Sequence, residues 1–320
     1  MTSRIVSTGS YLPLNKMSND DLADLVDTSD EWIQARTGIL YRHIATEETT
    51  VSMAVSAGKK AMEHGSVSAE DIELIIVATI SPDSFMPSTA CEVQEALGAK
   101  NAVAFDINAA CSGFIYALHT AHAYIQSGLY KTALIIGAET LSKMVDWKDR
   151  STCILFGDGA GACILKEDRV GILSLMQKSD GSKSQVLYCK NRETHNPYIK
   201  GNRNPQYMVM NGQEVYKFAL KKVPESIKEV VEKAQVELDT IKYFILHQAN
   251  KRILFSVAKR LSLPIEKFPM NLDQCGNTSA ASIPILLDEM NQKGMLKQGD
   301  KVVLSGFGGG LTWAGTLLEW

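Results

Sequence analysis

Short, strongly apolar runs separated by stretches of helical character are the feature that most constrains the fold of this chain. Six of these runs are predicted to be buried β-strands: Glu73–Ala78, Ala102–Ile107, Thr132–Gly137, Gly161–Leu165, Tyr243–Leu246 and Lys301–Ser305. Strands that alternate with helices favour an α/β architecture, in which parallel strands are covered by helices in α-β-α layers.

The chain also contains a weak internal repeat. Residues 105–137 and 270–306 share one plan, which is a short strand, a turn at a cysteine, a long helix and an apolar strand. FDINAACSG is matched with MNLDQCGNTS, and ALIIG with VVLSG. Likewise, VSAEDIELIIVATIS resembles VELDTIKYFILHQAN. We therefore expect two copies of one α/β unit, with an N-terminal half at 1–170, a C-terminal half at 171–320 and a loop-rich join between about 165 and 215.

Composition limits the functions that the chain can have. With 45% hydrophobic and 22% charged residues, the 320-residue chain is typical of a soluble globular protein, and its net charge of -3 gives no global reason to expect binding to nucleic acid or to an anionic membrane. The N-terminus contains no continuous apolar segment typical of a signal peptide, so we expect a cytoplasmic protein. Six scattered cysteines without a CxxC pair disfavour a zinc site and a disulfide framework.

Cys111 is the first candidate for catalysis. It follows an apolar strand and precedes the helical run FIYALHTAHAYIQ, so its sulfur is expected at the N-terminal end of a helix. The unpaired amide groups and the helix dipole at such a position favour the thiolate, which is the form that attacks a thioester. A buried structural cysteine is the alternative interpretation.

His247 and Asn277 are expected near this cysteine. His247 ends the strand YFIL and begins HQANKRI, and ligands collect at the carboxyl ends of strands in an α/β sheet. Asn277, within GNTSAASIP, occupies a place in the second copy that corresponds closely to that of Cys111 in the first. His119 and His122 are spaced as two metal ligands could be, but no partner lies at suitable spacing, so we interpret them as structural.

The run GFGGGLTW at 306–313 follows the apolar strand KVVLS. Three consecutive glycines let backbone amides approach a ligand with no side chain between them. The amide of Gly309 could therefore form an oxyanion hole together with the amide of Cys111. A tight turn is the alternative interpretation of the same glycines.

Together, DTSDEWIQARTGI, DINAACSGF, DWKDRST, FGDGAGA, HQANKRI, GNTSAASIP and GFGGGLTW, in this order over nearly the whole chain, resemble β-ketoacyl-acyl carrier protein synthase III. The resemblance implies the thiolase-like fold, a duplicated α-β-α-β-α unit, and a homodimer. It implies catalysis by Cys111, His247 and Asn277. Cys111 would take an acyl group from acyl-CoA and pass it to the carbanion formed when malonyl-acyl carrier protein loses carbon dioxide. No metal, flavin or nicotinamide cofactor is implied.

The resemblance also implies substrate-binding residues. Four would receive the adenine and phosphates of coenzyme A: Thr28, Trp32, Arg36 and Arg150. Trp32 and Arg36 are one helical turn apart after a plausible N-cap at Ser29. A basic patch would bind the acidic carrier protein: Lys217, Arg252, Lys259 and Arg260. Met86 aligns with a wall of the primer pocket, where a flexible side chain would admit longer or branched acyl groups.

Several other functions remain to be weighed. A thiolase needs a second reactive cysteine in its C-terminal Gly-rich motif, whereas Phe307 precedes the glycines here and Cys275 lies outside that pattern. Elongating condensing enzymes carry a second histidine where this chain has Asn277. A specialised synthase that makes a polyketide starter could keep the same triad and stays open. A protein that only binds acyl-CoA would need none of the three residues.

Overall fold

The computed structural model describes residues 1–190, 198 and 206–320, and its core is built from two sheets. The first sheet has the strand order β1-β7-β6-β4-β5. Its strands are β1 (Thr2–Tyr11), β4 (Leu74–Ala78), β5 (Val103–Ile107), β6 (Thr132–Glu139) and β7 (Gly159–Asp168). β4 lies parallel to both β5 and β6, whereas β7 is antiparallel to its neighbours β6 and β1.

The second sheet has the strand order β11-β12-β13-β8. Its strands are β8 (Ile172–Ser179), β11 (Tyr243–Leu246), β12 (Lys301–Gly308) and β13 (Thr312–Glu319). β11 and β12 are parallel, and the other two pairs are antiparallel. The first sheet uses strands from residues 2–168 and the second uses strands from residues 172–319.

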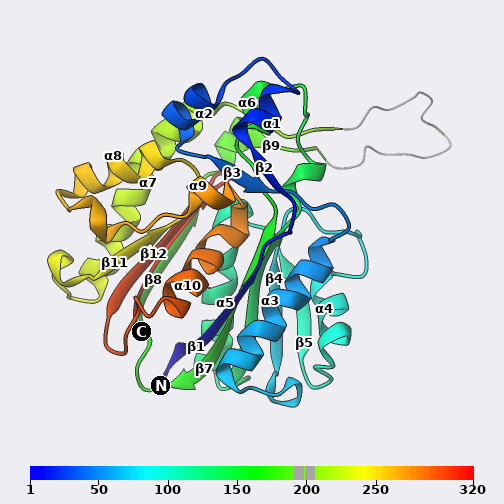
Figure 1. Cartoon of the computed structure of the whole chain (residues 1–320). Helices are drawn as coiled ribbons and strands as arrows, with labels where there is room; N and C mark the ends of the chain where they lie inside the picture. Colours follow the sequence, from blue (N-terminus) through cyan, green and yellow to red (C-terminus); the bar gives the residue numbers. More distant parts are fainter. Residues whose placement is uncertain (191–197, 199–205) are drawn as a thin grey trace.

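Helices cover both sheets and fill the space between them (Figure 1). The outer helices on the first sheet are α3 (Thr50–Gly65) and α4 (Thr89–Leu97), and those on the second are α7 (Gly212–Lys233) and α8 (Lys251–Leu261). Between the sheets lie α5 (Gly113–Gln126) and α10 (Ser282–Gln292), which share one hydrophobic core with strands of both sheets. This gives the five layers α-β-α-β-α that were predicted.

The sequences of the helices explain these positions. α5 buries nine of its residues, including both His119 and His122, because a helix between two sheets has no broad solvent face. α7 is amphipathic, with lysines and glutamates along its outer side. Gly137 in β6 allows the turn that leads into α10 to approach closely, because a Cβ there would lie 2.3 Å from the carbonyl oxygen of Ala280.

The six predicted strands are all present, with ends that shift by up to three residues. Three core strands were not predicted: β1, β8 and β13. β8 lies inside the segment that was interpreted as a loop-rich join, and it forms an edge of the second sheet. The later part of that segment, NRETHNPYIKGNRNPQ, falls almost entirely outside the described residues.

The structure corrects the register of the internal repeat. Cys111 lies in the 3-10 turn η2 (Ala110–Ser112) that leads into α5, and the matching turn before α10 is η7 (Ser279–Ala281). Both turns begin with a residue of positive φ, 46° at Ala110 and 47° at Ser279. Cys111 therefore corresponds to Ala280 and not to Cys275, because the short helix α9 (Leu272–Cys275) shifts the second copy.

Smaller elements surround the carboxyl ends of the core strands (Figure 1). They are α1 (Asn19–Ala23), α2 (Asp30–Thr37), α6 (Arg150–Cys153), the ribbon of β2 (Lys16–Ser18) with β3 (Tyr41–His43), and the ribbon of β9 (Leu187–Tyr188) with β10 (Val209–Met210). Five further 3-10 turns connect elements elsewhere in the described residues: η1 (Ala69–Asp71), η3 (Leu141–Lys143), η4 (Gly181–Val186), η5 (Leu238–Thr240) and η6 (Ile265–Lys267). Within the described ranges, no helix combines the length and the apolar character that crossing a bilayer requires.

Candidate active site

A cavity of about 820 Å³ opens at the carboxyl ends of the strands of the first sheet. The turns that follow β4, β5 and β6 form its walls, together with the Gly-rich loop after β12 and the β9 segment. Cys111, Ser279 and Gly309 lie among its lining residues. This position agrees with the expectation that ligands bind where α/β strands end.

Cys111 lies at the start of the central helix, as predicted. Its 3-10 turn follows β5 directly and continues into the 14 residues of α5, so the sulfur lies at the positive end of a helix dipole. The residue is 7% exposed, and burial raises the pKa of its thiol to about 12. Groups that donate a hydrogen bond to the sulfur are therefore needed to make the thiolate accessible.

His247 lies between the end of β11 and the start of α8, as predicted. Its Nδ1 is 2.7 Å from Oγ of Ser282, which also accepts a hydrogen bond from the backbone N–H of Gln248. The hydroxyl proton of Ser282 is thus available to Nδ1, and the ring proton then belongs on Nε2. Burial lowers the pKa of His247 to about 3, so the imidazole is neutral.

Asn277 is held in a fixed orientation in front of η7. Its Oδ1 accepts a hydrogen bond from the backbone N–H of Ser279 at 3.0 Å, which leaves the side-chain NH₂ group to donate elsewhere. Its backbone pairs with Leu155 and Gly157. Asn277 is 7% exposed and His247 is 1% exposed, and neither lines the cavity of the single chain directly.

The Gly-rich loop lies against the cysteine turn. A Cβ at Gly308 would lie 2.6 Å from the backbone nitrogen of Cys111, so only glycine permits this approach. Thr312 fastens the two segments, because its Oγ1 donates to the carbonyl oxygen of Ala109 at 3.0 Å. Within the described part of the chain, no backbone carbonyl accepts from the N–H of Cys111 or of Gly309.

Contacts join these residues into one site. Ser279 lies between Cys111 and Asn277, since its hydroxyl lowers the pKa of the thiol and its N–H binds the amide oxygen. His247 is bonded to Ser282, which begins α10 three residues after Ser279. The structure thus brings the three predicted catalytic residues together through η7.

The residues predicted for coenzyme A lie together at α2 and α6. Ser29 caps α2 as predicted, because its Oγ accepts from the N–H of Trp32. The guanidinium carbons of Arg36 and Arg150 lie 5.5 Å and 5.0 Å from the centre of the Trp32 ring. The hydroxyl oxygen of Thr28 is buried without a hydrogen-bond partner among the described residues.

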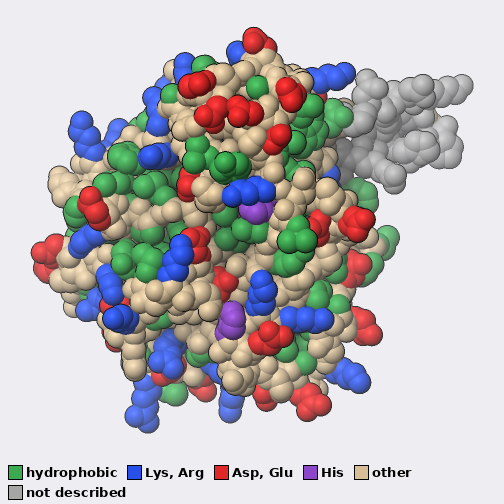
Figure 2. All heavy atoms as spheres, viewed as in Figure 1, with side chains coloured by type: hydrophobic (Ala, Val, Ile, Leu, Met, Phe, Trp, Pro, Cys, Tyr) green, Lys and Arg blue, Asp and Glu red, His purple; other side chains and the backbone are tan. Residues whose placement is uncertain are grey.

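The predicted basic patch lies on α7 and α8, and all four of its residues are exposed: Lys217, Arg252, Lys259 and Arg260. Figure 2 shows blue Lys and Arg side chains with green hydrophobic ones between them over this side of the molecule. A groove of about 420 Å³ between α2 and α8 includes Arg252, Tyr216 and the exposed Phe255.

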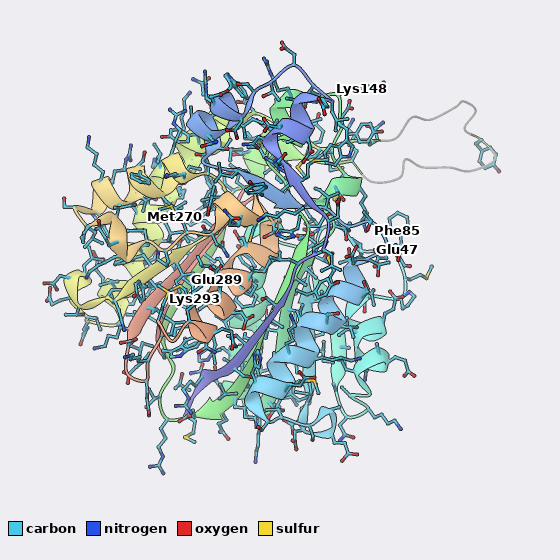
Figure 3. All side chains as sticks on the ribbon, in the orientation of Figure 1. Glu47, Phe85, Lys148, Met270, Glu289 and Lys293 are labelled. Carbon is cyan, nitrogen blue, oxygen red and sulfur yellow. The ribbon has the colours of Figure 1, made fainter. Side chains whose placement is uncertain are left out.

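Met86 lies outside the cavity of its own chain. Its side chain is 85% exposed, whereas the neighbouring Phe85 does contribute to the lining. Phe85 extends from the loop between β4 and α4 at the edge of the molecule (Figure 3). One copy of the chain therefore does not give Met86 the position in the primer pocket that was expected.

His119 and His122 make structural hydrogen bonds. The ring of His119 bonds to Gln177 and Thr316, and Nδ1 of His122 lies 2.8 Å from Oγ of Ser3. Both rings are buried in α5, away from the cavity. This is the role that was predicted for them.

Four residues of the site were not predicted: Glu139, Ser279, Ser282 and Thr312. Ser279 and Ser282 lie in the motif GNTSAASIP, and Thr312 lies in GFGGGLTW, so the motifs pointed to their positions but not to their contacts. Glu139 is the last residue of β6 and is completely buried. An acidic residue at the end of an otherwise apolar run was the available signal.

The chain was compared with known proteins. The family described as 3-oxoacyl-[acyl-carrier-protein (ACP)] synthase III matches residues 105–181, and its C-terminal model matches residues 231–320. The chain belongs to this family. A β-ketoacyl-[acyl-carrier-protein] synthase III of Clostridium botulinum (strain 657 / Type Ba4) is 52% identical over 319 residues, which are 99% of this chain and 98% of that protein. The protein of the same name from Clostridium acetobutylicum is 50% identical with the same coverage.

Solved structures of the family confirm the thiolase-like fold. The 3-oxoacyl-[acyl-carrier-protein] synthase III of Aquifex aeolicus VF5 superposes with a TM-score of 0.94 at 47% identity, covering 99% of this chain and 100% of that one. The priming β-ketosynthase of the R1128 polyketide pathway reaches a TM-score of 0.94 at 33% identity, covering 99% and 96%. The chain is thus an initiating condensing enzyme, which is an acyltransferase.

Proposed function

We propose that this enzyme transfers an acyl group from acyl-CoA to Cys111 and then condenses it with malonyl-acyl carrier protein to give 3-oxoacyl-acyl carrier protein. The observation that supports this most directly is the position of Cys111, which lies at the start of a buried helix and lines the cavity together with Gly309. In the first step the Cys111 sulfur attacks the thioester carbonyl, the bond to the sulfur of coenzyme A breaks, and coenzyme A leaves as the thiol.

The developing oxyanion would bind to two amides. The N–H groups of Cys111 and Gly309 have no backbone acceptor within the described part of the chain, and the close approach at Gly308 holds the two segments together. Two aligned donors in a buried site stabilise a negative oxygen more strongly than water does, because they do not have to reorient.

His247 and Asn277 would act in the second step. Loss of carbon dioxide from the malonyl group leaves an electron pair that is delocalised onto the thioester oxygen as an enolate. The neutral imidazole offers Nε2–H, and Asn277 offers its NH₂ group, because Ser282 and Ser279 occupy their other polar atoms. The carbanion then attacks the acyl-Cys111 thioester and forms the new carbon-carbon bond. The bond between the acyl carbon and the Cys111 sulfur breaks, and the sulfur leaves as the thiolate, which takes a proton from water to regenerate the thiol.

Coenzyme A would bind at α2 and α6. Trp32 offers an aromatic face that is 36% exposed, and Arg36 and Arg150 bring two guanidinium groups to it. An adenine ring can stack on such a surface, and guanidinium groups bind phosphate. The unpartnered hydroxyl of Thr28 supplies a further polar group at the same place.

The basic patch would bind the carrier protein. Arg252 lies beside the groove between α2 and α8, so its guanidinium is close to the α2 end where the pantetheine arm would enter. Lys259 and Arg260 continue the positive surface along α8. Lys217 is paired with Glu214 at 2.8 Å, which reduces its contribution to an acidic partner.

We also propose a homodimer that works in the cytoplasm without a cofactor. Phe85, Met86 and Val103 are 67%, 85% and 48% exposed along the β5 edge of the first sheet, where a second copy would bury them. Met86 can form part of a primer pocket only through such a contact. All six cysteines are free thiols, which fits a reducing compartment.

Intact-protein mass spectrometry tests the proposed function. The wild type and Cys111→Ala are mixed separately with acetyl-, isobutyryl- and longer acyl-CoA, and malonyl-acyl carrier protein is then added. We expect an acyl adduct on the wild type only, which malonyl-acyl carrier protein discharges as a 3-oxoacyl product. An adduct that malonyl-acyl carrier protein never discharges would indicate another acceptor, and the absence of any adduct would refute the proposal.

A further inference from the structure

Glu139 is a buried carboxyl group that the two steps above do not use. It ends β6, is 0% exposed, and lies below the wall of the cavity. Its Oε2 accepts hydrogen bonds from the hydroxyl of Ser81 at 2.6 Å, from the backbone N–H of Ile80 at 3.1 Å and from the hydroxyl of Thr79 at 3.3 Å. Its Oε1 makes no hydrogen bond of regular geometry among the described residues, although the backbone N–H of Ala280 lies near enough to lower the pKa of the carboxyl group.

Ser279 is the second buried group without a partner at this place. Its side-chain oxygen is buried and makes no hydrogen bond of regular geometry. Ser279 lines the cavity together with Cys111, and the next residue, Ala280, lies against β6 near Glu139, because its carbonyl oxygen is 2.3 Å from where a Cβ of Gly137 would be. The Ser279 hydroxyl also lowers the pKa of both Cys111 and Glu139. Two unsatisfied buried polar atoms on adjoining residues are rare in a native protein and point to a functional cause.

The charged groups around Glu139 do not neutralise it. Lys143, four residues further along the chain, forms an ion pair with Asp83 at 3.0 Å. Asp158, on the segment before β7, accepts from the backbone N–H groups of Ala45 and Ser142. His247 is bonded to Ser282 and is neutral. Cys111 is the titratable group that faces Glu139, and a negative charge on Glu139 opposes the formation of its thiolate.

Ser279 has one hydroxyl proton, and the state of Glu139 decides where that proton is directed. An ionised carboxylate can only accept, so it would draw the Ser279 proton to itself. A protonated carboxyl can instead donate to the Ser279 oxygen. We propose that Glu139 is a positioning residue that acts in its protonated form: its acid proton is donated to Ser279, and the Ser279 hydroxyl is then free to donate to the sulfur of Cys111.

The proposal has a defined pH dependence. Burial raises the pKa of Glu139 to about 7, so the protonated form dominates below neutrality and is lost as the pH rises through that value. Ionisation then has two unfavourable effects on the Cys111 thiolate, which are the loss of a donor and the addition of a nearby negative charge. Both disappear in Glu139→Gln, whose amide oxygen accepts as Oε2 does and whose NH₂ group donates like the acid.

This inference rests on the proposed role of Cys111 as the nucleophile, and its test is independent of the substrates. The rate at which iodoacetamide alkylates Cys111 is measured by peptide mass spectrometry between pH 6 and pH 9, with the exposed Cys91 as an internal reference. The variants are Glu139→Gln, Ser279→Ala and the double variant. Ser279→Ala is expected to fold, because Ala110 adopts the same positive φ in the matching turn.

We expect Glu139→Gln to alkylate at Cys111 as fast as the wild type at pH 6 and on the order of threefold to tenfold faster at pH 8.5, which is the effect of one charge-sensitive hydrogen bond. In the Ser279→Ala background this gain should shrink. Asp288→Asn is the matched control, since Asp288 is a buried carboxyl group that accepts from Thr8 and Ser10 at 2.8 Å and 2.6 Å outside the cavity. It should leave the alkylation profile unchanged.

A ratio between Glu139→Gln and wild type that is the same at every pH would overturn the inference, and so would an undiminished gain in the Ser279→Ala background. If Glu139→Gln does not fold, Ser279→Ala alone must still alkylate more slowly than the wild type at pH 6. Acylation of Cys111 by acetyl-CoA is measured in parallel, and it separates a failure of the Glu139 inference from a failure of the proposed function. An acyl adduct with unaltered pH profiles would refute only the role of Glu139, whereas the absence of an adduct in every variant would refute the function of Cys111.

Discussion

The hydroxyl of Ser282 should determine which ring nitrogen of His247 carries the proton, and Ser282→Ala tests this directly. In the wild type the buried Nδ1 receives the Ser282 proton at 2.7 Å, so that Nε2–H can donate to the thioester oxygen. In the variant, Nδ1 either remains buried without a partner or takes the ring proton from Nε2. In the second case the ring can no longer donate to the enolate.

The cost follows from the contact that is lost. A buried acceptor left without its hydrogen bond costs about 1–3 kcal/mol. If this cost falls entirely on the donating form of the ring, the condensation rate falls by about fivefold to about 150-fold, at about 1.4 kcal/mol for each factor of ten. Transfer of the acyl group to Cys111 should keep the wild-type rate, because that step uses the amides of Cys111 and Gly309 instead.

The assay follows the two half-reactions separately. Acylation is measured as the mass increase of the protein, and condensation as discharge of the preformed acyl-enzyme by malonyl-acyl carrier protein. Ser3→Ala is the matched control, because Ser3 is equally buried and its Oγ lies 2.8 Å from Nδ1 of His122. It should lower the melting temperature without slowing condensation. Equal losses in both half-reactions, or wild-type condensation by a folded Ser282→Ala, would refute the reasoning.

Three further predictions concern other contacts of the site. Gly308→Ala should abolish acylation, because its Cβ would lie 2.6 Å from the backbone nitrogen of Cys111. Gly181→Ala is the control: a Cβ there meets nothing within 4 Å, so the acylation rate and the melting temperature should not change. Trp32→Ala should raise the KM for acyl-CoA by about fivefold to tenfold through lost stacking, with little change in the rate at saturation. Neutralising Arg252 together with Lys259 should raise the KM for the carrier protein and flatten its dependence on salt; an unchanged salt dependence contradicts the proposed docking surface.

The strands that could be predicted from the sequence are those buried on both faces. β4 (LIIVA) is apolar at every position, so its sequence alone indicates burial. β1 (TSRIVSTGSY) was missed because half of its residues are small and polar, and several of these are buried only through tertiary hydrogen bonds. One example is Thr8, whose hydroxyl donates a hydrogen bond to Asp288 in the C-terminal half. Such partners are 280 residues apart and leave no local pattern.

The residues of the site divide in the same way, into those that a local pattern predicts and those that depend on tertiary contacts. The position of Cys111 could be predicted because a strand, a small-residue turn and a helix follow one another locally. The bond between His247 and Ser282 joins residues 35 apart, and the contact of Ser279 with Glu139 depends on how η7 lies on β6. Met86 was placed by resemblance alone, and a single chain does not place it in the cavity. Local patterns thus predicted the reactive group, whereas the groups that tune it depend on packing between the two halves.

The two halves explain why one turn can perform two chemical tasks. η2 and η7 share a positive φ at their first residue and lead into the two central helices, so the repeat supplies the same backbone twice. In the first copy Cys111 occupies the second position of the turn, where the helix dipole and the nearby amides favour an anion. In the second copy that position is Ala280, and the polar function has moved to Asn277 in front of the turn. The missing side chain at Gly137 is what lets the backbone of η7 lie directly on β6, since a Cβ there would lie 2.3 Å from the carbonyl oxygen of Ala280. This contact brings Ser279 close to the end of β6, where Glu139 lies. A side chain at position 137 should therefore separate η7 from β6 and disturb all of these contacts together.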